Sequence, residues 1–421
     1  IELSEERVQK AIAEGGIVET AEKVMLISTD SEESLDELAS LADTAGAVIV
    51  SRVLQKRPKP DPAMFIGAGK AQELSLACQT LEVDLAILDD ELTGAQQKNL
   101  ENALGVRVID RTSLILDIFA RRAETAEGKL QVELAQLKYR LPRLAGSSSA
   151  LSRLGGGIGT RGPGETRLEV DRRHIRRRID ELSRQLADLS RQREMRRARR
   201  GKMDQTTVAL VGYTNAGKST LLNALSGAEV LVEDKLFATL DPVVRQVSLP
   251  ENRSCLMVDT VGFIRKLPHT LVEAFKSTLE EAVYADLLVI VSDLSSPFYR
   301  QQREVVYEVL RQLGADGKPV VEALNKADKA EIGGMIEPAG AILISAASGM
   351  GLDHLKAEIS RRIASLRTRV TLSVPYAKGA VLNLLHDQGQ VETEEYTETG
   401  TNVTCLLDAT LYARVKKMLE S

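Results

Sequence analysis

Hydrophobic and polar positions in the first part of the chain alternate between two spacings. Short apolar runs of the kind that form buried strands occur at Val24–Ser28, Ala47–Val50, Leu85–Leu88 and Val106–Ile109. Helical spacing lies between them, as in Glu33–Ala45 and Gly94–Leu104. This alternation predicts a small α/β unit with a mainly parallel sheet over residues 1–112.

Residues 113–203 have helical spacing on both sides of a glycine-rich stretch. The period is helical over Ser113–Arg143 and again over Glu165–Arg200. In the second stretch, alternating steps of three and four residues, with one gap, make an apolar seam of Leu168, Ile175, Ile179, Leu182, Leu186 and Leu189. Ala145–Gly164 between them is rich in Gly and Ser. The pattern predicts an antiparallel helical hairpin whose loop is longer than a turn requires.

The α/β alternation returns over residues 204–366. The last block, residues 367–421, has the pattern strand, helix, strand pair and helix, which predicts a small α+β domain. The expected fold class is therefore α/β.

Composition is typical of a globular chain, with 43% hydrophobic and 27% charged residues among 421. The chain has no run of about 18 apolar residues, so the sequence predicts no transmembrane helix. The start, Ile1–Lys10, lacks the apolar segment of a secretory signal, and because it does not begin with Met we expect a few native residues to be missing. Cys78, Cys255 and Cys405 are far apart, which argues against a zinc site and for a reducing compartment; we expect the cytoplasm.

A phosphate-binding loop follows the strand Thr207–Val211. The sequence Gly212-Tyr-Thr-Asn-Ala-Gly217-Lys218-Ser219 leads into a helix, which is the setting that this loop requires. Its backbone N–H groups can surround a β-phosphate, Lys218 can contact the β- and γ-oxygens, and Ser219 can ligate Mg²⁺. The alternative, a chance match in a glycine-containing turn, is disfavoured by the strand before and the helix after.

Two further motifs predict the γ-phosphate end of the site. Asp259-Thr-Val-Gly262 follows the strand Cys255–Val258, so Asp259 can hold the hydration shell of Mg²⁺ and Gly262 can donate its N–H to the γ-phosphate. Between the motifs, Thr239 lies in Leu236–Pro242, where a threonine would complete the Mg²⁺ coordination when the γ-phosphate is present.

Base selection is predicted by Asn325-Lys326-Ala327-Asp328, which follows the apolar strand Val320–Leu324. The Asp328 carboxylate can accept the N1–H and 2-amino hydrogens of guanine, which adenine cannot supply. The Ala346 N–H, in Ser345-Ala346-Ala347, is the expected donor to guanine O6. Together these motifs favour GTP over ATP.

The predicted site residues form three sets. We expect Lys218, Thr239 and Gly262 to be catalytic, and Mg²⁺ to be held by Ser219 and Thr239, with Asp259 acting through bound water. We expect GTP and GDP to contact Gly212, Tyr213, Thr214, Asn215, Ala216, Gly217, Lys218, Ser219, Thr220, Phe237, Ala238, Thr239, Asp259, Gly262, Asn325, Lys326, Asp328, Ser345, Ala346 and Ala347.

Two positions bear on the mechanism. Phe263 follows the Asp-x-x-Gly motif where many such enzymes have a glutamine that orients the attacking water, so we expect slow intrinsic hydrolysis that a partner or a rearrangement assists. The Asn215 side chain can help to hold a K⁺ ion beside the phosphates, or it can simply shape the loop.

With these motifs, the chain resembles the HflX family of ribosome-associated GTPases, in the Obg–HflX group, over nearly its whole length. Outside the nucleotide motifs, the resemblance rests on Phe65–Lys70, Ile109–Phe119, Glu127–Gln136 and, most specifically, Gly155–Glu165. Phe237–Pro242 and Asp259–Ile264 also match. One departure is Ala347, where many relatives have a longer side chain.

The resemblance implies an N-terminal α/β domain with a long helical hairpin, a Ras-like GTPase domain and a small C-terminal domain. It also implies binding to the large ribosomal subunit and its rRNA, stimulation of the GTPase by ribosomes, and a role in splitting or rescuing stalled ribosomes. We expect a monomer, and a loop at Ala145–Gly164 that becomes ordered on RNA.

Arginines in the second hairpin helix suggest an RNA contact independently of the resemblance. Although the net charge is −5, the helix contains Arg172, Arg173, Arg176, Arg177 and Arg178, and Arg196, Arg197, Arg199 and Arg200 follow about five turns later. Arginine binds phosphate bidentately and stays charged. The alternative is a solvated face balanced by acidic neighbours such as Asp171 and Asp180.

Other functions remain open from the sequence. Gly67-Ala-Gly-Lys70 invites comparison with a second, ATP-binding loop, but Met64 replaces its first glycine and Ala71 its hydroxyl residue, so a turn into a helix is the favoured interpretation. One alternative is an RNA-remodelling or ribosome-assembly factor whose N-terminal ATP-dependent activity is timed by GTP. Another is a signalling switch that binds a protein effector.

Overall fold

The computed structural model describes residues 21–57, 59–147, 167–201, 206–228, 235–251, 253–266, 268, 271, 276–330, 340–365, 368–407 and 409–420. The chain divides into two compact units, Ile1–Arg184 with Lys266–Ala274, and Gln185–Arg265 with Phe275–Ser421. The α/β fold class predicted from the sequence is confirmed by the sheets that the two units contain.

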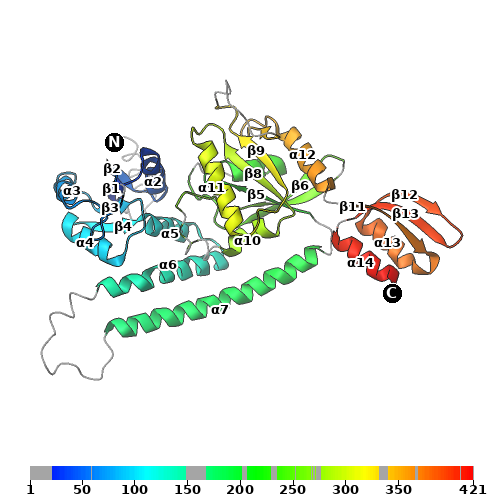
Figure 1. Cartoon of the computed structure of the whole chain (residues 1–421), viewed down its shortest axis with the longest axis horizontal. Helices are drawn as coiled ribbons and strands as arrows, with labels where there is room; N and C mark the ends of the chain where they lie inside the picture. The colour runs from blue at the N-terminus through cyan, green and yellow to red at the C-terminus, as the bar shows by residue number, and fades with distance from the viewer. Residues whose placement is uncertain are drawn as a thin grey trace, which may run out of the picture. The chain divides into compact units, whose positions relative to one another are not determined.

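The first unit contains a four-stranded parallel sheet in the order β2-β1-β3-β4 (Figure 1). Its elements are β1 (Lys23–Ser28), α2 (Glu32–Thr44), β2 (Val48–Leu54), α3 (Ala68–Thr80), β3 (Leu85–Leu88), α4 (Gly94–Leu104), β4 (Arg107–Asp110) and α5 (Arg111–Arg122). Local sequence explains the helix starts: Thr93 forms a capping box with Gln96, and the Asp110 carboxylate accepts the N–H of Ser113. The predicted parallel α/β unit is therefore confirmed.

A buried ionic cluster joins elements of the first unit. The Arg111 side chain is 2% exposed and donates to Asp89 (2.7 Å) and to Glu37. Asp89, which is fully buried, also accepts from Ser28 and from the Lys266 ammonium at 3.2 Å. Since an unpaired buried charge is costly, each charge in this cluster depends on the others.

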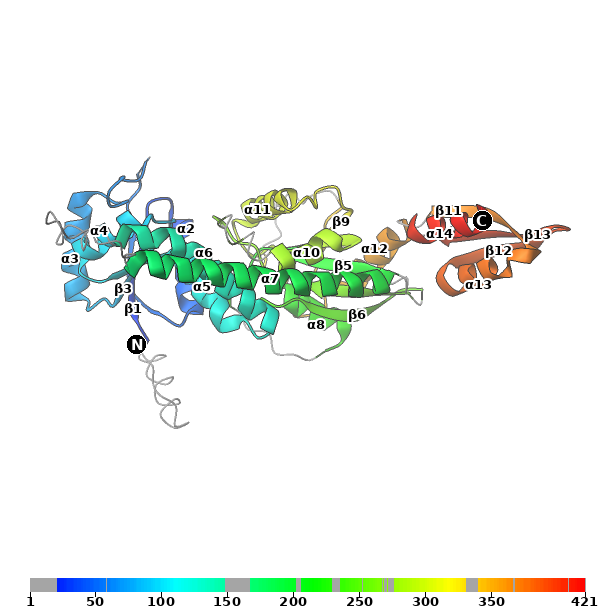
Figure 2. The same cartoon turned by 90° about the horizontal axis from the view of Figure 1, so that it is seen from below.

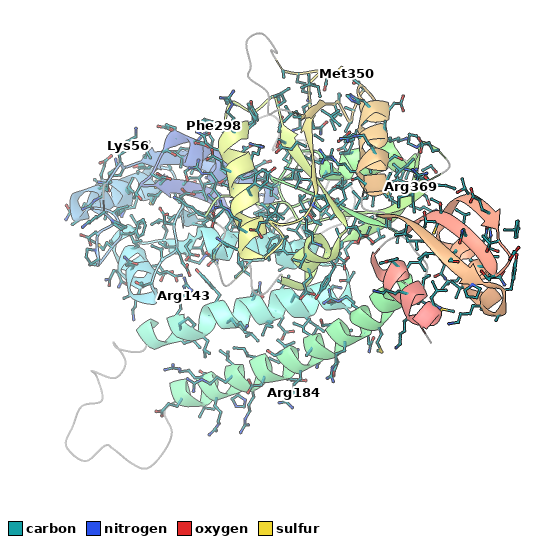
Figure 3. The ribbon with its side chains drawn as sticks, turned by 45° about the vertical axis from the view of Figure 1, so that its right-hand side comes forward. Lys56, Arg143, Arg184, Phe298, Met350 and Arg369 are labelled. Carbon is teal, nitrogen blue, oxygen red and sulfur yellow. The ribbon has the colours of Figure 1, made fainter. Side chains whose placement is uncertain are left out.

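The helical hairpin differs from its prediction in one respect. The helical stretch expected over Ser113–Arg143 is two helices, α5 and α6 (Ala126–Ser147), because Ala123 is extended (φ −66°, ψ 108°) and the Thr125 hydroxyl caps the second helix by accepting the N–H of Gly128 at 2.9 Å. Arg143, labelled in Figure 3, lies near the end of α6 and donates to the Leu92 carbonyl oxygen at 2.8 Å.

The other arm of the hairpin is α7 (Arg167–Gly201). The Arg178 guanidinium on α7 makes two hydrogen bonds to the Glu133 carboxylate of α6, at 2.7 and 3.0 Å, so the arms lie side by side there (Figure 1). Of the predicted apolar seam, Leu182 is fully buried. Residues 148–166, which include most of the glycine-rich stretch, lie outside the described residues.

The second unit contains a six-stranded sheet in the order β10-β9-β8-β5-β7-β6, in which only β6 is antiparallel to its neighbour. Its elements are β5 (Thr207–Gly212), α8 (Lys218–Ser226), β6 (Val243–Leu249), β7 (Arg253–Asp259), α10 (Lys276–Tyr284), β8 (Leu287–Asp293), α11 (Tyr299–Gln312), β9 (Val320–Asn325), β10 (Ile342–Leu343) and α12 (Leu352–Ser365). The parallel central strands β5 and β8 are buried along almost their whole length. Since ligands bind at the carboxyl ends of such strands, the fold itself indicates where a site should lie.

The end of the chain forms an antiparallel sheet in the order β11-β13-β12 with two helices against it (Figure 2). Its elements are β11 (Thr368–Pro375), a 3₁₀ turn η1 (Tyr376–Lys378), α13 (Gly379–Gln388), β12 (Gln390–Tyr396), β13 (Gly400–Leu407) and α14 (Ala409–Glu420). Alternate residues of β13, from Thr401 to Leu407, are buried on the helix side. The predicted order of strand, helix, strand pair and helix is confirmed.

Among the described residues, no helix is both long and apolar enough to cross a membrane. Cys78, Cys255 and Cys405 are free thiols, and all three are buried.

Candidate nucleotide site

The phosphate-binding motif, which runs from the last residue of β5 into α8, has no room for a side chain at two of its glycines. A Cβ on Gly212 would collide with the Val291 carbonyl oxygen of the neighbouring strand β8. Gly217 has φ +89°, and a Cβ there would collide with the Asn325 side chain. Strand β8 and the predicted base-selecting motif therefore both pack directly against the phosphate-binding loop.

Lys218, the first residue of α8, is directed into this loop. Its ammonium donates to the carbonyl oxygens of Gly212 (3.2 Å) and Tyr213 (2.9 Å). Burial lowers the pKa of Lys218 to about 8, although nearby Asp259 acts in the opposite direction. A desolvated ammonium at this point has a strong electrostatic interaction with an anion placed before it.

Three oxygen atoms form a compact cluster at the start of α8. The Ser219 hydroxyl donates to Asp259 Oδ2 at 2.5 Å and lies 2.8 Å from the Thr239 hydroxyl, which itself donates to Asp259 Oδ2 at 3.1 Å. Burial raises the pKa of Asp259, while Lys218 and the two hydroxyls oppose this effect. Asp259 Oδ1 is buried and has no hydrogen-bond partner among the described residues. An all-oxygen donor set with spare acceptor capacity fits Mg²⁺.

Asn325 joins three loops at the other end of the site. Its amide donates to the Ala216 carbonyl oxygen at 2.8 Å, and its Oδ1 accepts the N–H of Ala346 at 2.9 Å. Met350, labelled in Figure 3, closes the Ser345 loop, because its carbonyl oxygen accepts the N–H of Ser345 at 2.9 Å. The phosphate-binding loop and the two predicted base-binding motifs are thus held in one arrangement.

Lys326 is oriented by a neighbouring strand end. Its ammonium pairs with Asp293 Oδ2 at 2.8 Å, and its backbone has φ +61°. Asp293 ends β8, while Lys326 follows β9, so the ion pair sets the direction of the lysine stem.

Phe263 has a backbone role in the structure. Its side chain is 1% exposed, its N–H donates to the Gly212 carbonyl oxygen at 3.0 Å, and its carbonyl oxygen accepts the N–H of Thr214 at 2.7 Å. Nearby, the Tyr213 hydroxyl accepts the N–H of Arg265 at 2.8 Å. The segment after Gly262 is therefore paired with the phosphate-binding loop, and the Phe263 side chain is not available to a ligand.

These elements surround one cavity of about 200 Å³. Of the predicted contact residues, those that line it are Thr214, Asn215, Gly217, Lys218, Ser219, Thr220, Phe237, Ala238, Thr239, Gly262, Asn325, Lys326, Asp328, Ser345, Ala346 and Ala347. Gly212, Tyr213, Ala216 and Asp259 lie behind this lining and hold it through the bonds given above.

Three lining residues were missed by the sequence reasoning. Lys235, Thr260 and Lys329 also line the cavity. Thr260 and Lys329 lie next to predicted motif residues, so their positions were a usable signal. Lys235 directly precedes the predicted stretch Leu236–Pro242, so its position in the sequence was a usable signal as well.

The arginines predicted to contact RNA have different environments. On α7, Arg173, Arg176 and Arg177 are exposed and Arg172 is half-buried. Arg178 is engaged by Glu133 and by Glu181 at 3.0 Å. Side chains of residues 196–200 lie outside the description.

The glycine-containing motif of the first unit is a turn into a helix. Gly67 is the N-cap of α3, and the Lys70 ammonium pairs with Glu73 of the same helix at 2.6 Å. This lysine is therefore directed along its own helix, as the favoured interpretation of the sequence expected.

Comparison with known families covers most of the chain. Residues 32–120 match a family described as the N-terminal region of GTP-binding GTPases, residues 122–200 match their middle region, and residues 207–326 match a family described as 50S ribosome-binding GTPase.

Two relatives that match over most of their length share the name GTPase HflX. A GTPase HflX of Caldanaerobacter subterraneus subsp. tengcongensis is 52% identical over 400 residues, which cover 94% of this chain and 92% of that protein. The GTPase HflX of Escherichia coli K12 is 41% identical over 378 residues, or 88% of each chain. A GTP-binding protein of Sulfolobus solfataricus, solved with GDP, is 27% identical and covers 82% of this chain and 99% of its own, with a TM-score of 0.44.

The two HflX relatives align along both units, and the guanine-nucleotide motifs lie at a single cavity; this chain belongs to the HflX family of GTPases.

Proposed function

We propose that this GTPase binds the large ribosomal subunit, splits or rescues stalled ribosomes, and depends on the subunit for fast GTP hydrolysis. The observation that carries the proposal is Phe263. Its buried side chain and paired backbone cannot orient the attacking water, so the enzyme needs a partner or a rearrangement to reach its full rate. The match of residues 207–326 to ribosome-binding GTPases supports the ribosome as that partner.

In the proposed site, each loop has a separate task. The backbone of Asn215–Ser219 and the Lys218 ammonium bind the β- and γ-phosphates, while Gly262 donates its N–H to the γ-phosphate. Asp328 selects guanine, and Ala346 donates to its O6. The Asn325 bonds keep these groups in place before the nucleotide arrives, which reduces the cost of ordering them on binding.

Ser219 and Thr239 would hold Mg²⁺ and Asp259 would act through bound water; when bound, the ion neutralises charge on the β- and γ-phosphates. Asn215 lines the cavity, is exposed and has φ +60°, which suits a loop residue that also helps to hold K⁺. Equal turnover in KCl and NaCl would refute the K⁺ assignment.

We assign the rRNA contact to Arg172, Arg173, Arg176, Arg177 and Arg178 of α7. Because Arg178 is bonded to Glu133, charge reversal at Arg178 would also break the pairing of the two arms. The informative variant is therefore Arg176→Glu with Arg177→Glu, which should weaken subunit binding and leave GDP binding intact. As a matched control, glutamate replaces Arg311 and Arg361, which are exposed arginines on α11 and α12.

We expect the protein to be a cytoplasmic monomer. The deciding experiment is steady-state GTP hydrolysis by the purified protein in KCl, with and without purified large ribosomal subunits. Strong stimulation supports the proposal, and an unchanged rate refutes it. ATP-dependent RNA unwinding that survives Lys218→Ala would instead favour the RNA-remodelling alternative.

A further inference from the structure

The C-terminal sheet has exposed aromatic side chains at one turn. Tyr396, the last residue of β12, is 73% exposed and Tyr376 of η1 is 59% exposed, more than any other aromatic side chain that the structure describes. The Tyr376 hydroxyl donates to the Thr397 carbonyl oxygen at 2.8 Å, and Thr397 directly follows Tyr396, so both tyrosines lie at the turn between β12 and β13. This turn extends past α13 and α14 (Figure 1 and Figure 2). Neighbouring tyrosines that remain in water indicate an interaction surface.

The same turn is acidic. Gln390–Gly400 contains four glutamates and neither lysine nor arginine. Two of the four are paired within the domain, as Glu392–Arg369 and Glu394–His386. The other two, Glu395 and Glu398, are exposed and have no ion pair or hydrogen bond with the residues that the structure describes. Lys378 of η1 does not balance them, because its ammonium donates to two carbonyl oxygens at the end of α14, at 2.8 and 3.1 Å.

The backbone next to these glutamates lies at the edge of the sheet. In the order β11-β13-β12, β12 has a neighbouring strand on one side only within the described ranges. An edge strand presents N–H and C=O groups that an extended segment of another protein can pair with. The turn therefore offers backbone groups, carboxylates and aromatic rings together.

These groups fit a basic protein segment better than they fit RNA. Unpaired carboxylates repel the phosphates of an RNA backbone, whereas an arginine side chain pairs with carboxylate and stacks on a tyrosine ring. Protein segments that bind rRNA are rich in arginine and lysine, since they must neutralise its phosphates. On a ribosomal subunit, such a segment is the complementary surface for an acidic turn.

We propose that the β12–β13 turn binds an extended, arginine-rich protein segment of the large ribosomal subunit. The segment pairs its backbone with the edge of β12, and its arginines contact Glu395, Glu398 and the Tyr396 ring. This contact is separate from the rRNA contact assigned to α7, and it rests on the proposed binding to the large subunit.

Photo-crosslinking identifies the partner directly. The full chain with p-benzoylphenylalanine in place of Tyr396 is irradiated in complex with purified large subunits, and the product is identified by mass spectrometry. We expect a crosslink to a protein segment with clustered arginines. A crosslink to rRNA or to a protein segment without such arginines would overturn the proposal, as would no crosslink from a chain that is bound to the subunit.

Charge reversal tests the two carboxylates. Glu395→Lys with Glu398→Lys should weaken binding to the large subunit about tenfold at low salt, and the difference should shrink at high salt. The matched control is Glu304→Lys with Asp316→Lys, at exposed acidic residues on and just after α11. Added lysines favour binding to rRNA in general, so the control should bind no more weakly than the parent protein. Unchanged or tighter binding by the Glu395 and Glu398 variant would overturn the proposal.

Substitution of Tyr396 tests the stacking contact. Tyr396→Ala should weaken subunit binding about fivefold, whereas Tyr396→Phe should retain most of the affinity because the ring makes the contact; equal losses in the two variants would contradict this role. Cys405 of β13 is fully buried, so its protection from alkylation reports that the C-terminal domain of each variant is folded. Failure of the parent protein to bind the large subunit would refute the proposed function, and this inference with it.

Discussion

Removing the Asn325 side chain tests whether the three nucleotide loops are organised by a single residue. Asn325 is 2% exposed and makes two hydrogen bonds, to Ala216 and Ala346, which belong to different loops. In Asn325→Ala, a buried carbonyl oxygen and a buried N–H both lose their partner, at about 1–3 kcal/mol each. The expected loss in the free energy of unfolding of the second unit is therefore about 2–6 kcal/mol.

The assay must report on this unit alone, because a chain with several folded parts does not unfold in one step. Cys255 lies in β7 of the same sheet and is 2% exposed. Pulse alkylation in increasing urea, read by mass spectrometry at Cys255, follows the unfolding of that sheet. GDP affinity should also fall at least tenfold, or about 1.4 kcal/mol, because the nucleotide must then order the loops itself.

Gln246→Ala is the matched control, since it removes one exposed side-chain hydrogen bond, to Ser254, from the same sheet. It should change the free energy of unfolding by less than about 0.5 kcal/mol. If Asn325→Ala costs no more than this control and binds GDP normally, the two bonds do not organise the site and the reasoning is wrong.

Three further perturbations have definite expected outcomes. Asp89→Ala leaves the Arg111 guanidinium without its fully buried partner, and urea unfolding of the first unit should show a loss of about 3–5 kcal/mol; a loss under 1 kcal/mol would contradict the cluster's role. Gly262→Ala places a Cβ under 3.0 Å from the phosphate-binding loop, so GTP hydrolysis should be nearly abolished, whereas Gly317→Ala, with open space around its Cβ, should hydrolyse GTP normally. Burial raises the pKa of the Cys255 thiol to about 12, so alkylation of Cys255 in the native protein should require opening of the sheet. GDP at 100 times its Kd should slow this alkylation about 100-fold, and an alkylation rate indifferent to GDP would contradict the expectation.

A sequence predicts a site most directly where the residues that form it are close together in the chain. The glycines of the phosphate-binding loop, Lys218 and the base-selecting motif are recognisable because each works through neighbours in sequence and through the strand that precedes it. The parallel strands were equally predictable, since their continuous apolar runs reflect burial on both faces. Whole-length relatives then showed the family.

Contacts between distant segments could not be predicted in this way. The helical period continues through residues 113–143, but the extended backbone at Ala123 divides the stretch into α5 and α6. Lys235 lines the cavity although it lies just outside the Leu236–Pro242 motif, and Arg178 has an acidic partner 45 residues away. No local pattern encodes that pairing.

The sequence by itself determined the fold class, the order of the elements and the nucleotide motifs, because periodicity and motif spacing are local properties of the chain. Only the tertiary structure decided that Phe263 is a backbone support, that Asn325 joins three loops, and that the Thr214 hydroxyl is left without a partner in the described residues. The physical reason is that burial and hydrogen-bond satisfaction depend on segments far apart in sequence, which meet only when the sheet has formed.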